Sequence, residues 1–272
     1  MSLTPPTAGP PMPMPPAPPD GAAPTRRAGP PLLLIIAVAV LGLGALAGGV
    51  VPIAVDLTRK PTDAEIRAAG VKELAGRWRI LTAGEIFPGR VEVRARDRFM
   101  KEMDPPAWTA VRAGIAPEAS CAAAFDAALA KVLAKHGCRT ALRATYLDGS
   151  GTLAATVGIA VMPDTRRASQ AEGDFGATLG VHGVKERYGV RAVPVPGTAA
   201  AAFSDRRRRS FWLDTNGTPY LFFRSSGWLA DRGGPPPAAT DETFRFAGAA
   251  LDRIAQTFAA NADVCERRGV RC

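Results

Sequence analysis

The chain has 272 residues, with 34 lysines and arginines against 25 aspartates and glutamates, so its formal charge is +9. This length suits one domain with appendages or two small domains, and a hydrophobic content of 47% excludes a wholly disordered protein. The presence of two histidines and four cysteines excludes a zinc-rich or haem-rich protein. Arginine far outnumbers lysine, as GC-rich coding favours, so the high charge is weak evidence for a nucleic-acid partner.

Residues 1–31 form the first segment, in which proline is concentrated and aliphatic residues are scarce. Such a segment buries too little apolar surface to offset the entropy of ordering, so it predicts a disordered, proline-rich tail. Its PxxP spacings, such as Pro10 to Pro13, are typical of ligands for proline-binding grooves. A spacer of biased composition explains the same residues.

Residues 32–55 carry no charge, and a helix of this length spans about 36 Å, enough to cross a bilayer. The competing interpretation is a signal peptide cleaved after Ala45-Leu46-Ala47. The apolar run continues past Ala47 and its leader is long, so we predict an uncleaved, single-pass transmembrane helix in contact with lipid. Gly44 and Gly48 have the spacing of a close helix–helix contact and suggest a homodimer.

The side of the membrane on which the C-terminal part lies is predicted by two opposing arguments. The positive-inside rule favours a cytoplasmic C-terminal part, because four cations follow the span closely and two precede it. Large domains are translocated largely regardless of charge, however. The four cysteines Cys121, Cys138, Cys265 and Cys272 are even in number and suit two disulfides in an oxidising compartment. We therefore expect a cytoplasmic N-terminus and an extracytoplasmic C-terminal domain; reduced, buried cysteines are the alternative.

The pairing of the cysteines is predicted from a helix. Apolar residues between Ala119 and His136 repeat with helical period, which predicts one continuous helix. A straight helix would hold Cys121 and Cys138 about 25 Å apart, too far for a disulfide. We therefore expect Cys265 and Cys272 to pair with these two cysteines, in either of the two combinations.

The remaining elements predict an α+β fold, an antiparallel sheet with packed helices, tethered by the transmembrane helix. Residues 56–75 are predicted as a juxtamembrane helix or linker, opened by a capping box at Thr62–Glu65, and residues 76–272 as the domain. The expected strands and helices of the domain follow in chain order: extended segments at 78–83 and 90–96, a hairpin of 140–147 with 152–162, a short helix from 163 toward 171, a strand at 190–195, a hairpin of 211–214 with 220–224, and a helix capped by Thr240 whose apolar stripe is Phe244, Ala247, Leu251, Ile254 and Phe258.

Residues for chemistry are scarce in the sequence. No nucleophile-elbow, zinc-protease, P-loop or dinucleotide motif is present, and we expect no catalytic residue, no cofactor and no metal site. Arg206, Arg207, Arg208 and Arg209 form a candidate patch for an anionic partner. Tyr220, Phe222 and Trp228 are candidate lining residues of a ligand groove. A solvated loop explains the arginines and a core strand explains the aromatic residues equally well.

The run from Cys121 through Met162, together with Gly84–Pro88 and Ser225–Arg232, is similar to a group of uncharacterised actinobacterial membrane proteins. The resemblance covers residues 75–272 and implies a proline-rich tail, one membrane helix and a cysteine-bearing external domain. It implies no activity.

The sequence therefore predicts a non-catalytic binding, sensing or accessory domain at the cell envelope, with an envelope protein or an anionic polymer as partner. The first alternative is an envelope enzyme whose site shows no motif. The second is a membrane-tethered cytoplasmic domain that binds nucleic acid.

Overall fold

The computed structural model describes residues 60–94, 107–182, 188–229, 241–260, 264–267 and 270. These residues form an α+β domain with a six-stranded antiparallel sheet, which confirms the predicted fold class. The strands are β1 (Arg90–Arg94), β2 (Ala107–Ile115), β3 (Thr140–Asp148), β4 (Leu153–Val161), β5 (Arg208–Thr215) and β6 (Tyr220–Trp228). The helices are α2 (Asp63–Ile80), α3 (Ala83–Ile86), α4 (Cys121–Ala124), α5 (Ala127–Lys135), α6 (Thr165–His182) and α7 (Arg245–Thr257), with short 3-10 turns at Ala199–Ala202, Asp205–Arg207, Asp241–Phe244 and Val264–Glu266.

The strands lie in the order β1-β2-β3-β4-β6-β5. Both predicted hairpins are present, since β3 pairs with β4 and β5 pairs with β6. Gly217, in the Asn-Gly turn of the second hairpin, has a φ of 70°, a conformation that glycine adopts without steric cost. The register then alternates side chains between two apolar faces, and each face needs a cover.

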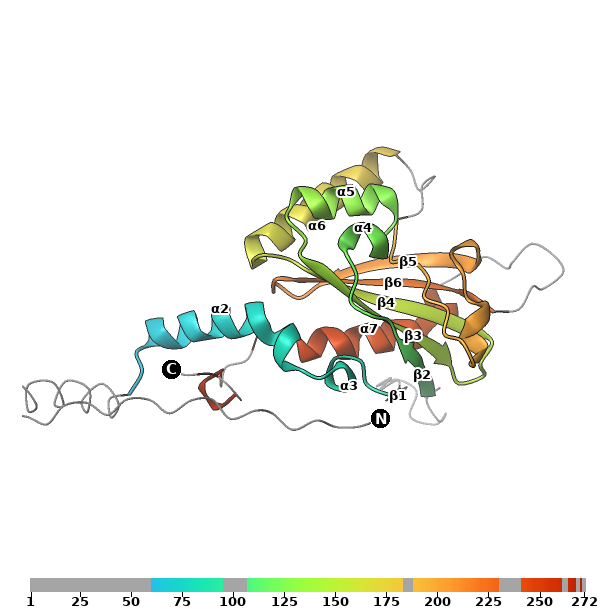
Figure 1. The fold of residues 1–272 in the computed structure, drawn as a ribbon, viewed down its shortest axis with the longest axis horizontal. Coiled ribbons are helices and arrows are strands. Elements are labelled where there is room, and N and C mark those ends of the chain that lie inside the picture. The colour runs from blue at the N-terminus through green and yellow to red at the C-terminus, as the bar shows by residue number, and fades with distance from the viewer. Residues whose placement is uncertain are drawn as a thin grey trace, which may run out of the picture. The chain divides into compact units, whose positions relative to one another are not determined.

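One face is covered by α7, with α3 and the end of α2 beside it; the other is covered by α4, α5 and α6 (Figure 1). The predicted apolar stripe of α7 is confirmed, since all five of its side chains are buried against the sheet. Thr240, the predicted cap, lies outside the described residues.

The helix predicted over residues 119–136 is broken, and the prediction of one continuous helix was wrong. Phe125, with φ −121° and ψ 161°, is extended and separates α4 from α5. The backbone of this break pairs with a neighbouring segment, because Asp126 donates its N–H to the carbonyl of Gly189 and Arg191 donates to that of Ala124. The ring of Phe125 is buried, 4.8 Å from that of Phe223. An alanine-rich periodicity does not reveal such a break.

The break brings Cys121 and Cys138 together in a disulfide, with their Cα atoms 6.4 Å apart. The prediction that excluded this pair was therefore wrong, and so were both predicted pairings of these cysteines with Cys265 and Cys272. Cys265 is also disulfide-bonded. Cys272, the remaining cysteine of the chain, lies outside the described residues.

Three other predicted boundaries differ. The extended segment predicted at 78–83 begins inside α2, which continues past Gly76 to Ile80. The helix predicted to end near residue 171 continues to His182. The strand predicted at 190–195 lies across the face of the sheet instead of within it. Val190 packs on Gly158, where a Cβ would meet a Val190 methyl at 2.7 Å, and Val193 bonds through its backbone to the side chains of Thr145 and Thr156.

A buried arginine fastens α2 to the rest of the domain. The Arg77 guanidinium donates to both carboxylate oxygens of Glu73, at 2.7 and 2.5 Å, and to the carbonyls of Thr257 and Ala259 at the end of α7. Burial by itself raises the pKa of Glu73, but the bond and charge of Arg77, helped by Arg267, outweigh it and hold that pKa below its ordinary value. The Glu73 carboxyl therefore stays ionised at neutral pH.

No helix in the described part of the chain is both long and apolar enough to span a bilayer. The predicted span at residues 32–55 lies outside that part, as do the proline-rich tail and the Gly44 and Gly48 pair.

The disulfide gives a stability prediction. Replacing Cys121 and Cys138 together by alanine should lower the free energy of unfolding by about 3 kcal/mol, because the bond closes a loop of 17 residues. Urea unfolding of the full chain and of the double variant measures the difference. Equal midpoints and slopes would contradict the prediction.

Candidate functional site

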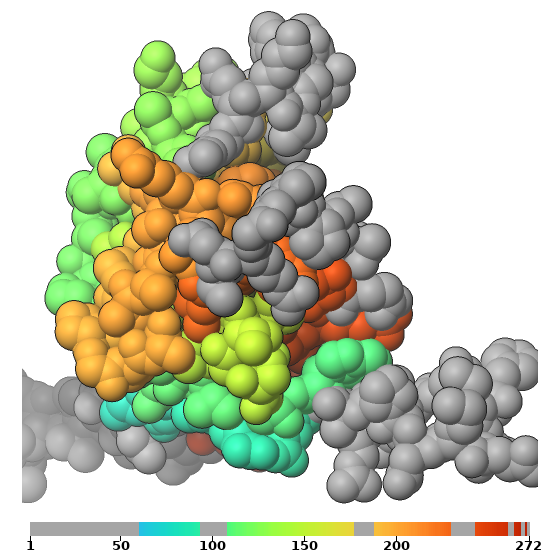
Figure 2. Space-filling view, turned by 90° about the vertical axis from the view of Figure 1, so that its right-hand side faces the viewer, coloured from blue at the N-terminus to red at the C-terminus, as the bar shows by residue number. Residues whose placement is uncertain are grey.

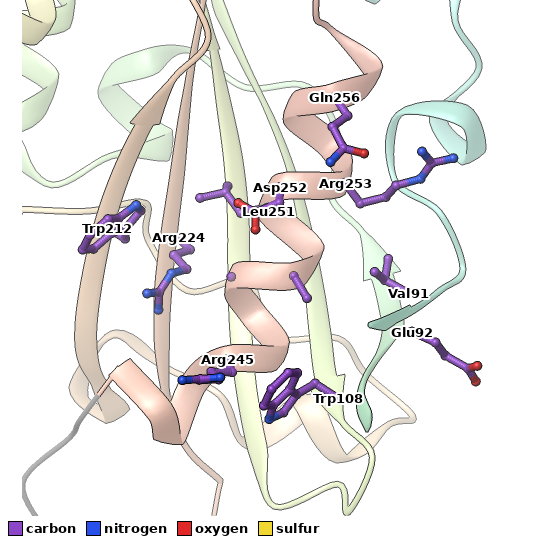
Figure 3. A pocket seen from close by; sticks show the side chains of 12 residues that line it. Val91, Glu92, Trp108, Trp212, Arg224, Arg245, Leu251, Asp252, Arg253 and Gln256 are labelled. Atoms are coloured by element: carbon purple, nitrogen blue, oxygen red, sulfur yellow. The ribbon is translucent and has the colours of Figure 1, made fainter. Parts of the chain in front are cut away.

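A groove of 660 Å³ lies over the outer face of α7 and extends onto the strands at both sides of it (Figure 3). We call it the α7 groove. Figure 2 shows the molecule from the side on which α7, in red, and the segment around β5, in orange, face the viewer. The lining residues come from β1, β2, β5, β6 and α7: Val91, Glu92, Trp108, Trp212, Arg224, Arg245, Gly248, Ala249, Leu251, Asp252, Arg253 and Gln256.

The middle of the groove is hollow because α7 carries small residues there. Gly248 and Ala249 lie about one turn after Arg245 and one turn before Asp252; both are half-buried, and Ala249 packs against the edge of the core. A Cβ added to Gly248 would meet no atom within 4 Å. The helix thus presents small residues between Arg245 on one side and Asp252, Arg253 and Gln256 on the other.

The flank formed by β5 and β6 carries an indole over a buried guanidinium. Trp212 is 50% exposed, whereas Arg224, on the neighbouring strand, is 5% exposed. The Arg224 Cζ lies 5.6 Å from the centre of the Trp212 ring, a cation–π distance, and its Nη1 lies 3.4 Å from the Ser210 hydroxyl. The remaining surface of the Trp212 indole faces outward and is open to a ligand.

The opposite flank repeats this arrangement with a second pair. Trp108 of β2 is half-buried against the core, and Arg245 of α7 places its Cζ 4.8 Å from the centre of the Trp108 ring. Figure 3 shows Trp108 and Arg245 together at one end of α7, with Val91 and Glu92 on the strand beside them.

Asp252 supplies an acidic group at the centre of the groove. Burial raises its pKa above the ordinary value for aspartate; the charge of Asp214 raises it further, and Arg224 opposes both. The groove therefore offers flat aromatic surface, guanidinium donors and a carboxylate acceptor within one continuous hollow. Such a set binds a ligand that carries both apolar faces and hydrogen-bonding groups.

The predicted arginine patch is divided by the fold. Arg206 and Arg209 are exposed and Arg207 is half-buried, but Arg208 is only 3% exposed. Its guanidinium binds both carboxylate oxygens of Asp126, at 2.7 and 2.8 Å, and the carbonyl of Val190 at 2.9 Å. The register of β5 shifts between Arg208 and Ser210, which leaves Arg209 at a bulge. The structure thus uses one of the four arginines to hold the break between α4 and α5.

The predicted aromatic groove does not form around its three residues. Tyr220 and Phe222 have no exposed surface and pack in the core. The Tyr220 hydroxyl donates to the carbonyl of Leu74 at 2.5 Å, and burial raises the pKa of Tyr220 to about 12. Trp228 is half-buried, its ring 6.0 Å from that of Phe244. These side chains hold α2 and α7 against the sheet.

The residues of the α7 groove were missed by sequence reasoning because each has an ordinary explanation when taken singly. Arg245, Asp252 and Gln256 are what the solvated face of an amphipathic helix carries. The available signal was the pair Gly248-Ala249 in the middle of α7, together with Trp212 and Arg224 at directly opposite positions of two paired strands.

Within the part of the chain that the structure describes, no group of three or more histidine, cysteine, aspartate or glutamate side chains is placed to hold a metal ion. Comparison of the chain with protein-family models, with curated proteins and with solved structures finds no match. The candidate site therefore rests on its own geometry.

The divided arginine run gives a mutational prediction. Arg208→Ala should lower the free energy of unfolding by about 3 kcal/mol, because it removes a buried guanidinium and leaves the Asp126 carboxylate, only 14% exposed, without its partner. Arg209→Ala, the matched control one residue away, should change it by less than about 0.5 kcal/mol, because Arg209 is exposed. Chemical unfolding measures both, and equal losses would contradict the assignment.

Asp252 gives a pH prediction. Its folded-state pKa is raised, so its ionisation disfavours the fold, and stability is lost as the pH rises through that pKa. Asp252→Asn should therefore be more stable than the parent at pH 7, and the difference should vanish below the pKa of the unfolded carboxyl. Thermal unfolding from about pH 2, well below the ordinary aspartate pKa of about 3.9, up to about pH 7 tests this. A variant less stable at pH 7 would show that the attraction to Arg224 prevails.

Proposed function

We propose that the chain is a single-pass membrane protein, similar to the actinobacterial group above, whose C-terminal domain binds a ligand or partner at the cell envelope without catalysing a reaction. The α7 groove is the observation that carries the proposal, because its lining combines aromatic, cationic and acidic side chains. The proposal includes a sensing role or an accessory role, in which the partner is an envelope protein or polymer.

Two further features support the proposed location. Residues 32–55 are uncharged and long enough for one transmembrane helix, and a cytoplasmic tail of residues 1–31 would precede it. The Cys121–Cys138 disulfide is typical of domains that mature in an oxidising compartment. In this proposal residues 32–55 contact lipid, and two copies of the chain form a homodimer through Gly44 and Gly48.

An envelope enzyme is the second candidate, and Asp252 is the observation that favours it. A carboxyl with a raised pKa beside a second carboxylate, that of Asp214, is an arrangement that hydrolases use for acid–base chemistry. Turnover of wall, lipid or peptide substrates by the purified chain, abolished by Asp252→Asn, would establish it in place of a binding function.

The distribution of lysines gives a direct test of topology. Residues 1–55 contain no lysine, whereas Lys72 and Lys131 are exposed on the domain. A membrane-impermeant amine reagent added to intact protoplasts that express the full chain should label both lysines, and labelled peptides are identified by mass analysis.

Labelling of these lysines only after lysis, together with free thiols at Cys121 and Cys138, would place the domain in the cytoplasm. The nucleic-acid hypothesis would then take first place, and it requires binding that weakens steeply with added salt.

A further inference from the structure

We propose that the α7 groove binds a stretch of an uncharged glycan chain, with the Trp212 indole as the platform for one sugar ring. The inference deepens the proposed function, since it names the ligand class of the same groove. Three features of the groove lead to it: its shape, its charge balance and its exposed indole.

The shape of the groove suits a chain that passes through it. The lining positions of α7 run from Arg245 to Gln256, about 16 Å along the helix axis, which is the length of a short oligosaccharide. The hollow is open over Gly248 and Ala249 instead of being enclosed. A polymer can enter and leave such an open groove at its two ends.

The charges of the groove suit a ligand that is polar and uncharged. Arg224, Arg245 and Arg253 are opposed within the groove by Asp252, and Asp214 places a second negative charge near Asp252; Glu92, at the rim, is paired with Arg90. An anionic polymer would meet these carboxylates, and a cationic one would meet the arginines. Sugar hydroxyls both donate and accept, so they can use guanidinium donors and carboxylate acceptors together.

The exposed indole suits the apolar face of a sugar ring. Half of the Trp212 surface is open, a large value for a tryptophan in a folded domain. One part of the indole rests on the buried Arg224, whose position is fixed by the neighbouring strand, so the indole is held in place before a ligand arrives. The C–H groups of a pyranose can stack on the part that remains. Trp108, with Arg245 over its ring, offers a second contact toward the other end of the groove.

The test uses the full chain in detergent and a panel of soluble tetrasaccharides as probes: chitotetraose, mannotetraose, maltotetraose and, as an acidic member, a hyaluronan tetrasaccharide. We expect at least one uncharged tetrasaccharide to bind, measured by calorimetry and by a change in tryptophan fluorescence. Trp212→Ala should weaken that binding at least tenfold, and Trp212→Phe should restore part of it, because phenylalanine keeps a flat apolar ring.

The matched pair Gly248→Leu and Gly173→Leu separates blocking of the groove from damage to the fold. Each glycine lies in a helix where an added Cβ would meet no atom within 4 Å, but Gly173 belongs to α6, on the other face of the sheet. Gly248→Leu should abolish binding and Gly173→Leu should leave it unchanged, with thermal unfolding confirming that both variants fold.

Three outcomes would overturn the inference: no uncharged member of the panel binds, only the acidic tetrasaccharide binds and does so in a salt-dependent way, or binding survives Gly248→Leu. Each of these leaves the lysine-labelling result intact, so failure of the glycan assignment is distinguishable from failure of the proposed topology. Release of new reducing ends from a bound tetrasaccharide would instead favour the enzyme.

Discussion

The six-stranded sheet has two apolar faces, and both must be shielded from water by a small number of helices. This constraint determines the rest of the structure. The outer strands of such a sheet lie about 24 Å apart, whereas a helix with its side chains is about 10 Å wide. On the α7 face, α3 and the end of α2 cover the β1 side through Ile86 and Phe87. On the β5 side the strands supply their own cover, because Trp212 lies over Arg224. The groove thus follows α7 and the strips that this one helix leaves uncovered on both sides of it, and its polar lining follows from that partial exposure.

The other face solves the same problem with a broken helix and a crossing segment. Neither is regular structure, so their backbone groups need partners from elsewhere. Arg208 supplies such a partner. Its guanidinium binds Asp126, which immediately precedes α5, and the carbonyl of Val190 in the crossing segment. The Cys121–Cys138 bond then joins the start of α4 to the residues that follow α5. A buried charge and a covalent bond together replace the hydrogen-bond ladder that the crossing segment lacks.

The elements that could be predicted from the sequence are those whose signals are local. The hairpins at 148–152 and 216–217 and the stripe of α7 follow from turn chemistry and from periodicity, and the structure has them. The errors arise where a distant partner decides the local conformation. Phe125 is extended because the carbonyl of Gly189 accepts the N–H of the next residue, Asp126, and because the Phe125 ring packs against Phe223. Both partners are distant in the sequence. The α7 groove was beyond prediction for the same reason, since its residues come from five elements and each is unremarkable on its own element.

A buried junction made by Arg77 joins α2 to the end of α7, the helix that lies under the groove. The last carbonyls of a helix have no partner within it, and Arg77 supplies donors to Thr257 and Ala259 where α7 ends. Glu73 and Tyr220 hold α2 from two further directions, the first through the Arg77 guanidinium and the second through the carbonyl of Leu74. Under the proposed topology α2 begins a few residues after the span, so the helix that forms the floor of the groove is fastened to the helix nearest the membrane by buried polar bonds. Such bonds are directional, unlike apolar contacts, and cannot slide without leaving a buried charge unpaired. This junction accounts for the presence of an arginine at one of the most deeply buried positions of the described domain.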